Sequence, residues 1–293
     1  MMSRNLDPRR FLRTAPAMIL VLSSLAFSAC SAGIGSSTQP THSVLETVPT
    51  PESFQSLALA EIQTFPFLML VNNDYSLPDA EVKEAMANVH PYIPAMSEGI
   101  LLHPTVMEAT QNLFAGASAT QYERFMVTSG YRTYVQQKQL YESAADKSFV
   151  MKPNHSEHQT GLAVDIGWQG MPGSQMAQSP QGQWLADNAF RYGFILRYPE
   201  DKTAITGVAF EPWHFRYVGQ PHAYYCHTNG LCLEEYLSRL QSGGEYTLAI
   251  EGKTYHVYYE KPRNGIIKVP PGIFWEAAED NTGGVIITSW ENY

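Results

Sequence analysis

Two short motifs, well separated along the chain, most constrain what this sequence folds into. The first is SEHQTGLAVD at 156–165, and the second is EPWH at 211–214. They offer two imidazoles and one carboxylate to a metal ion, with a second carboxylate beside the last histidine. Two histidines and an aspartate leave a position open on zinc, which is typical of a catalytic site. A free glutamate nearby is a candidate base for activating water. The motifs therefore predict a metal-dependent hydrolytic site.

The first motif contains a predicted strand at 161–166. Strand alternation puts Asp165 on a face that otherwise carries only Gly161 and Ala163. A metal lying above the sheet needs a face cleared of bulk in this way. The alternative is an aspartate that simply ends a core strand.

The second motif cannot lie inside a helix. Pro212 removes a backbone donor and biases Glu211 away from helical dihedral angles. In a regular strand Glu211 and His214 face opposite sides of the sheet. We therefore expect a bulge or a strand end near Trp213 to bring both side chains to one metal.

A candidate cationic group follows the predicted strand 125–129. Gly130 permits an unusual backbone there, and Arg132 comes two residues later. A guanidinium held at that turn binds a carboxylate or the oxyanion of a tetrahedral intermediate. The alternative is an ordinary surface arginine.

The N-terminus predicts export. A positively charged start precedes an apolar run at 15–27 that is too short to span a bilayer comfortably. We predict a signal peptide at 1–29 of lipoprotein type, which makes Cys30 the lipidated first residue. The alternative is an ordinary cleaved secretory signal. Residues 30–53 are rich in Ser, Thr, Pro and Gly and predict a flexible linker.

Composition excludes one class of partner. The 293-residue chain has a formal net charge of −9 and no long basic run, so nucleic-acid binding is not expected. An apolar fraction of 44% favours a packed globular protein. After a Ser-Gly-Gly break, residues 245–293 predict a small all-β region without a chemical motif.

Two cysteines lie close together beyond the motifs. Their spacing favours a disulfide between Cys226 and Cys232, because an exported protein meets an oxidising environment. Free thiols are one alternative. A second zinc site with His222 and His227 is another.

Taken together, these motifs resemble the VanY-type zinc D-alanyl-D-alanine carboxypeptidases of the lysostaphin/D-Ala-D-Ala peptidase/Sonic hedgehog metallopeptidase group. The resemblance is carried by the two opening motifs, the SGYR run at 129–132 and the YGFILRY run at 192–198. It covers about half of the chain and implies a metal-dependent enzyme, not a serine-type D,D-peptidase. His155 departs from the family pattern, and we interpret it as a neighbour of the metal ligands.

The resemblance implies a role for each matched residue. It makes His158, Asp165 and His214 the ligands of one zinc ion per chain. Glu211 becomes the general base and Arg132 the group that stabilises the scissile carbonyl oxygen. The implied contacts to the peptide are Ser156, Gln137 and Tyr198, with Trp213 in the pocket wall.

The implied fold is α+β, a hedgehog/D,D-peptidase-like antiparallel sheet with the metal on one face and helices on the other. We predict a catalytic domain at 54–241 and a β accessory region at 245–293. The implied reaction is hydrolysis of the terminal D-Ala-D-Ala bond of peptidoglycan stem peptides. Alternatives are an L,D-carboxypeptidase, a D,D-dipeptidase, or a non-catalytic cell-wall-binding lipoprotein. We expect a monomer in the bacterial cell envelope, attached to the outer face of the cytoplasmic membrane only through its lipid.

Overall fold

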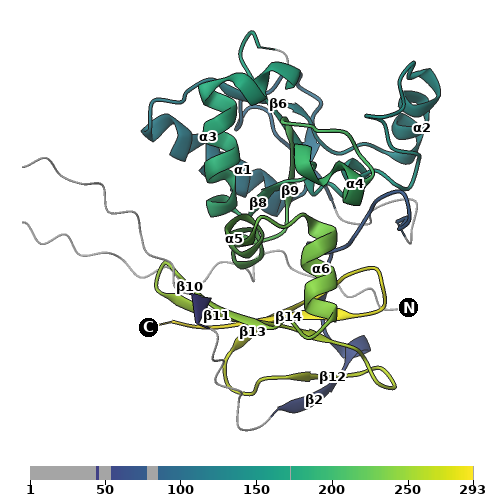
Figure 1. Ribbon diagram of the computed structural model, residues 1–293, viewed down its shortest axis with the longest axis vertical. Coiled ribbons are helices and arrows are strands. Elements are labelled where there is room, and N and C mark those ends of the chain that lie inside the picture. The colour runs from purple at the N-terminus through teal and green to yellow at the C-terminus, as the bar shows by residue number, and fades with distance from the viewer. Residues whose placement is uncertain (1–43, 46–53, 78–84, 172, 293) are drawn as a thin grey trace, which may run out of the picture. The chain divides into compact units, whose positions relative to one another are not determined.

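The computed structural model describes residues 44–45, 54–77, 85–171 and 173–292 (Figure 1). The predicted signal peptide at 1–29, Cys30 and most of the predicted linker at 30–53 lie outside these ranges. Within them, no helix is both long enough and apolar enough to cross a membrane. The helices are α1 Pro104–Ala119, α2 Tyr134–Ser143, α3 Pro180–Asn188, α4 Thr203–Thr206, α5 Gln220–Asn229 and α6 Leu233–Gln241. The strands are β1 Val44–Leu45, β2 Gln55–Ala58, β3 Thr64–Phe65, β4 Ala87–Asn88, β5 Leu101–Leu102, β6 Phe125–Ser129, β7 Ala163–Trp168, β8 Phe194–Leu196, β9 His214–Tyr217, β10 Tyr246–Ile250, β11 Lys253–Glu260, β12 Ile266–Val269, β13 Phe274–Glu279 and β14 Val285–Asn292.

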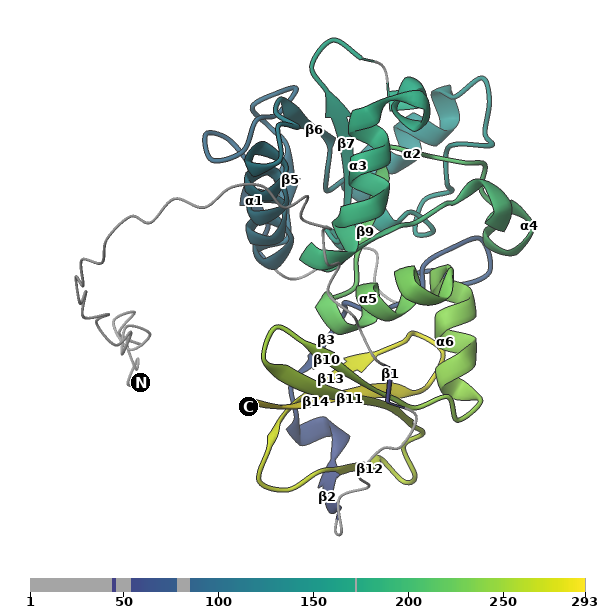
Figure 2. The ribbon, with the colours of Figure 1, turned by 60° about the vertical axis from the view of Figure 1, so that its left-hand side comes forward.

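A four-stranded antiparallel sheet carries both opening motifs. Its strand order is β6-β7-β9-β8. Val164 and Ile166 of β7 are fully buried, in one core cluster with Leu113 of α1 and Leu185 of α3. Figure 2 shows α1 and α3 beside this sheet. Asp165 lies between the two apolar residues and therefore faces the opposite side. The predicted α+β fold is confirmed.

A second, six-stranded sheet has the order β1-β10-β11-β14-β13-β3. Its pairs are antiparallel except that of β13 with β3, which is parallel. Strand β2 pairs with β12 in a separate two-stranded sheet. Short strands from early in the chain therefore complete sheets that are otherwise built from its end. The boundary between 54–241 and 245–293 stays a prediction, and strands from both sides of it pair with each other.

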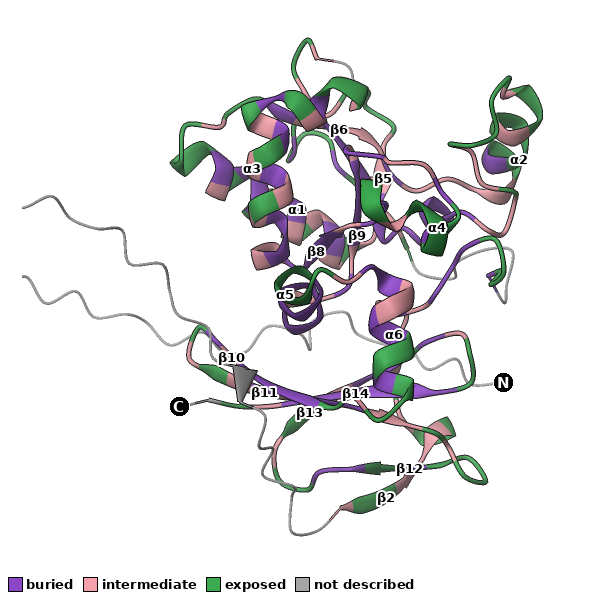
Figure 3. Cartoon of the chain, viewed as in Figure 1, coloured by how far each residue is buried: buried purple, intermediate pink, exposed green. Residues whose placement is uncertain are grey.

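Helices α5 and α6 lie against the second sheet (Figure 1). Tyr224 and Tyr236 of these helices share a core cluster with Leu248 and Val257 of the sheet. Figure 3 shows α5 as mostly buried with an exposed end. The buried part is covered on all sides, as expected of a helix that lies between two layers. Its buried residues are Pro221, His222, Ala223, Tyr224, Tyr225 and Cys226.

Candidate metal centre

A short 3₁₀ helix at Glu157–Thr160 presents His158. It ends at Gly161, which has a φ of 72°, a conformation that glycine adopts without strain. The predicted strand therefore begins two residues later than expected, at Ala163. His158 Nδ1 lies 2.7 Å from the carbonyl oxygen of Gly130. That hydrogen bond leaves Nε2 to face Asp165, at 3.4 Å from Oδ1.

The pairing of β7 with β9 supplies the other two candidate ligands. Asp165 and His214 are direct partners in the register. His214 Nδ1 lies 3.1 Å from Asp165 Oδ1. The ligand atoms of His158, Asp165 and His214 all lie within 4.8 Å of one another, and all three residues are buried. The predicted ligand set is thus brought together by strand register and one short helix.

Glu211 reaches the same point because β9 begins only at His214. Residues before it form a turn in which the His214 amide donates to the Glu211 carbonyl at 3.1 Å. Glu211 Oε2 consequently lies 3.6 Å from His214 Nδ1. The predicted strand end near Trp213 is what the structure shows.

The donor set suits a zinc ion. Two imidazole nitrogens and a carboxylate oxygen are ligands that zinc prefers. Each histidine has its other ring nitrogen beside an acceptor, the Gly130 carbonyl for His158 and Glu157 Oε2 for His214. Asp165 Oδ1 is buried without a well-aligned hydrogen bond, although both imidazoles lie nearby. An unsatisfied buried carboxylate oxygen is expected where a cation belongs.

The protonation equilibria also favour a bound cation. Burial lowers the pKa of His158, which keeps its imidazole neutral as metal binding requires. Burial also disfavours charge on His214, but contacts with Asp165 and Glu157 outweigh it and raise the pKa to about 9. The carboxylates of Asp165 and Glu157 therefore favour positive charge at this point. The same two histidines hold the pKa of Asp165 well below its usual range despite burial.

Burial raises the pKa of Glu211 to about 7, and the neighbouring Asp165 adds to the increase. A carboxylate with a pKa near the working pH is suited to accept and return a proton. Glu211 is only 5% exposed and lines the cavity described below. Among the acidic residues that line the cavity, Glu211 is the one that belongs neither to the candidate ligand set nor to the ion pairs of Glu157 with the arginines.

Arg132 points into the site from the turn after β6. Its NH2 group lies 3.6 Å from Asp165 Oδ2 and donates to Ser129 Oγ at 3.1 Å. Gly130 is required there for space, not for an unusual φ. A Cβ at that position would lie 2.3 Å from the Leu101 carbonyl oxygen, to which the next residue donates.

A cavity of about 70 Å³ opens over these groups. Three of the four predicted peptide contacts, Ser156, Tyr198 and Trp213, line it. Gln137 does not; it is fully buried and accepts from Arg132 NH1 at 3.2 Å. The full lining is Arg132, Phe149, Met151, Ser156, Glu157, His158, Asp165, Tyr198, Val208, Glu211, Trp213 and His214.

Sequence reasoning missed Phe149 and Glu157. Phe149 lies in a loop without a motif, and its ring centroid is 6.2 Å from that of Trp213. Glu157 directly precedes a predicted ligand, so its place in the motif was the available signal. His155 stays outside the ligand set, as interpreted, with Nδ1 2.7 Å from the Asn72 carbonyl oxygen.

The cysteine prediction differs from the structure, in which Cys226 and Cys232 are buried free thiols. Burial raises the pKa of the Cys232 thiol to about 12 and that of Cys226 further. The thiolate needed for disulfide exchange is therefore disfavoured at both positions. A second zinc site is not supported either, because both ring nitrogens of His222 have partners, Tyr236 and Thr288.

Comparison with known proteins places this site in context. Residues 99–220 match the VanY family, described as D-alanyl-D-alanine carboxypeptidase. A D-alanyl-D-alanine carboxypeptidase of Enterococcus faecium is 32% identical to the chain, over 83% of this chain and 82% of the relative. Another, from Enterococcus faecalis, is 38% identical over 58% of this chain and 65% of the relative.

Solved structures of D,D- and L,D-peptidases are also similar to this chain. The vancomycin-resistance D,D-dipeptidase VanXYg, in complex with a D-Ala-D-Ala phosphinate analogue, has a TM-score of 0.70 at 29% identity, covering 82% of this chain and 99% of that chain. The LD-carboxypeptidase LdcB gives 0.53 at 34% identity, over 58% of this chain and 84% of that chain. A mutant D,D-pentapeptidase VanY in complex with Zn(II) gives 0.50 at 37% identity, over 58% and 98%.

Proposed function

Because the chain belongs to the VanY family of D-alanyl-D-alanine carboxypeptidases, we propose that it hydrolyses the terminal D-Ala-D-Ala bond of peptidoglycan stem peptides as a zinc metallopeptidase. One observation carries the proposal. Three candidate ligand atoms lie within 4.8 Å of one another, and a further carboxylate lies 3.6 Å from one of them. That is a complete metal set with a separate base.

The ligands of one zinc ion in this proposal are His158, Asp165 and His214. Zinc, when bound there, polarises the scissile carbonyl and lowers the pKa of water. The carboxylate of Asp165 offsets part of the cationic charge. The neutral state of His158, maintained by burial, keeps a nitrogen lone pair available.

Glu211 and Arg132 do the remaining chemistry. Glu211 takes the proton from the attacking water and then delivers it to the leaving amine, and its pKa of about 7 suits both steps. Arg132 donates hydrogen bonds to the carbonyl oxygen as negative charge develops. Gln137 holds Arg132 in place through the 3.2 Å hydrogen bond to NH1.

The cavity wall recognises the peptide. Ser156 and Tyr198 offer hydroxyl groups to the backbone and the terminal carboxylate, and Trp213 contributes an apolar surface.

We also propose that the protein is exported and held at the cell envelope by a lipid on Cys30. The support is the charged start, the apolar run at 15–27 and the small residues before the cysteine. Replacing Cys30 with alanine should release active protein from the membrane fraction into the medium. Membrane retention of that variant would contradict the anchor. We propose a monomer, which light scattering tests directly.

Purified zinc-loaded protein incubated with pentapeptide stems, tetrapeptide stems and free D-Ala-D-Ala tests the activity. Mass spectrometry should show loss of the fifth residue from the pentapeptide, abolished by a chelator and restored by added zinc. Activity that resists the chelator contradicts the metal mechanism. Release of only the fourth residue would replace the D,D assignment with L,D, an alternative that the similarity to LdcB favours.

A further inference from the structure

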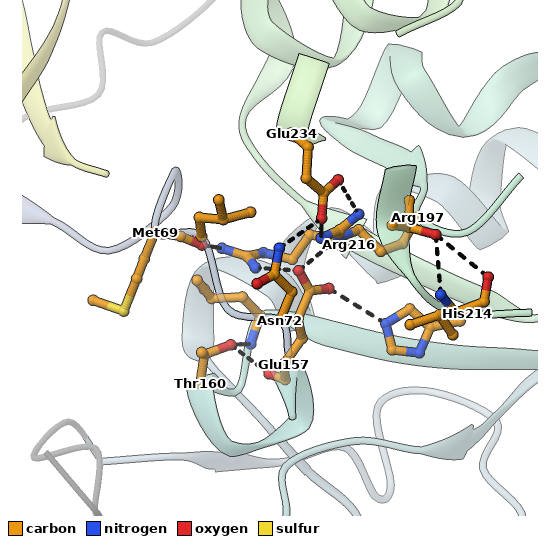
Figure 4. A network of polar contacts seen from close by, with 12 residues as sticks. Met69, Asn72, Glu157, Thr160, Arg197, His214, Arg216 and Glu234 are labelled. Carbon is orange, nitrogen blue, oxygen red and sulfur yellow. Dashed lines mark hydrogen bonds and ion pairs between the residues drawn. The ribbon is translucent and has the colours of Figure 1, made fainter. Parts of the chain in front are cut away.

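Glu157 is a fully buried carboxylate whose two oxygens have different partners. Oε1 accepts hydrogen bonds from Arg197 Nε at 2.7 Å and from Arg216 NH1 at 2.8 Å. Oε2 lies 3.4 Å from His214 Nε2. Figure 4 shows the carboxylate between the two guanidinium groups and the imidazole. Both arginines thus occupy one oxygen and leave the other to the histidine.

The charges of this cluster balance. Arg197 also donates to both oxygens of Glu234, at 2.8 and 2.7 Å. Two carboxylates therefore face two guanidinium groups, which is the condition for keeping buried ions charged. Arg197 and Arg216 are both 0% exposed, so water does not compete for these contacts. Burial opposes the charge of Glu157, but the two arginines hold its pKa well below the usual range.

The cluster is anchored outside the site. Arg216 NH2 donates to the carbonyl oxygens of Phe67 and Met69, at 3.1 and 2.9 Å. Asn72 donates to Glu234 Oε1 at 3.0 Å. The arginines are consequently held by an irregular segment near the start of the described chain and by α6 (Figure 4).

We propose that Glu157 is the positioning residue of His214. By accepting a hydrogen bond from Nε2–H, its carboxylate fixes the tautomer and ring orientation in which the Nδ1 lone pair faces Asp165 and the metal. Carboxylate partners of this kind also make a histidine ligand more basic. His158 has a carbonyl oxygen in the equivalent role, so the two imidazoles are held by acceptors of different charge. The proposal rests on the assignment of His214 as a zinc ligand.

Nuclear magnetic resonance on the zinc-loaded wild-type protein, with ¹⁵N-labelled histidine, tests the tautomer without any substitution. Two-bond couplings should show His214 with its proton on Nε2 and none on Nδ1. A proton on Nδ1 would overturn the proposal. This readout does not depend on turnover. A protein that fails to hydrolyse stems but shows the Nε2 proton loses the proposed function and keeps this inference.

Glu157→Gln tests the energetic contribution. The amide keeps an oxygen for the two arginines but turns an NH₂ group toward His214 Nε2, which opposes a proton there. Zinc affinity, measured by competition with a chromophoric chelator, should fall by about 10- to 100-fold. The matched control is Glu235→Gln, the same change at a residue of α6 that caps the helix and pairs with Lys202. It should retain wild-type zinc affinity.

A structural role alone predicts a different result. In that case Glu157→Gln lowers the melting temperature, but the folded variant binds zinc as tightly as the wild type, which overturns the proposal. If the variant does not fold, the tautomer measurement on the wild-type protein decides. Glu234→Gln is an intermediate case, because it weakens the ion pair that holds Arg197 but leaves the carboxylate beside His214 in place. Its loss of zinc affinity should be smaller than that of Glu157→Gln.

Discussion

Asp165 and His214 face each other across paired strands, with 3.1 Å between Asp165 Oδ1 and His214 Nδ1. Two of the three candidate ligands are therefore fixed by the hydrogen-bond ladder of a sheet, whose other face is a packed core. His158, Glu211 and Arg132 reach the same point from turns. Substitutions of the three candidate ligands should remove the metal. Substitutions of Glu211 and Arg132 should instead separate metal binding from chemistry.

Glu211→Gln should retain zinc and lose hydrolysis. The amide has nearly the shape of the carboxylate but cannot accept a proton from water, so kcat should fall by roughly 10²- to 10⁴-fold. Metal content by atomic spectroscopy and kcat on pentapeptide stems check both parts. Asp165→Asn is the matched carboxylate-to-amide control and should lose the metal as well as activity. Normal turnover by Glu211→Gln would refute its role as the base.

Gln137→Ala should lower kcat although Gln137 does not touch the cavity. Its amide fixes Arg132 through the hydrogen bond to NH1, and without it the guanidinium is less well placed for the oxyanion. Arg132→Lys sets the scale, because removing such a donor costs roughly 10²- to 10³-fold in kcat. A Gln137→Ala enzyme with normal kcat and only a raised KM would instead support the peptide contact expected from the sequence.

The sequence contained enough to predict the three candidate ligands that the structure brings together, and the irregular strand end. Residue type and spacing fix both, since Pro212 excludes a helix and alternation fixes the face of Asp165. It was less informative about the segment at 67–71, where an apolar run predicts a strand. That segment is irregular because the buried Arg216 satisfies the Phe67 and Met69 carbonyls that a ladder would otherwise use.

The pairing of strands that are distant in the sequence could not be predicted either. The parallel pairing of Thr64 with Ala277 joins segments that are far apart in the sequence. Strand β3 has only two residues, which is too short for a recognisable alternation of apolar and polar side chains. The ion cluster of Glu157 has the same character, since its arginines come from β9 and from the segment after β8. Contacts between polar residues that are distant in the sequence depend on the completed fold, and they produce no periodic pattern of residue types along the chain.

Gly130→Ala should destabilise the turn that carries Arg132. The new Cβ would lie 2.3 Å from the Leu101 carbonyl oxygen, so backbone has to move. Overpacking of this kind costs about 1–3 kcal/mol in the free energy of unfolding. Gly99→Ala is the control, because nothing lies within 4 Å of its added Cβ. Urea denaturation measures both, and equal stability of the two variants would contradict the steric explanation.

Acid should lower the stability of the folded protein through His222 of α5. Its ring lies between Tyr236 and Thr288, with Nδ1 2.6 Å from the Tyr236 hydroxyl and Nε2 3.1 Å from Thr288 Oγ1. Burial lowers the pKa of His222 from 6.5 to about 3. The unfolded chain therefore takes up a proton in this range while the folded protein does not, and stability falls as the pH drops from 6.5 toward 3.

The loss that His222 contributes at pH 5, relative to pH 7, should be about 2 kcal/mol in the free energy of unfolding. His222→Gln keeps polar atoms near Tyr236 and Thr288 but does not titrate, so its loss over the same interval should be smaller by that amount. Comparing each protein with itself at the two pH values cancels the static effect of the substitution. Subtracting the loss of one protein from that of the other then cancels the titration of the groups that both share. Equal losses in the two proteins would mean that His222 is protonated in the folded state, and that burial does not control it.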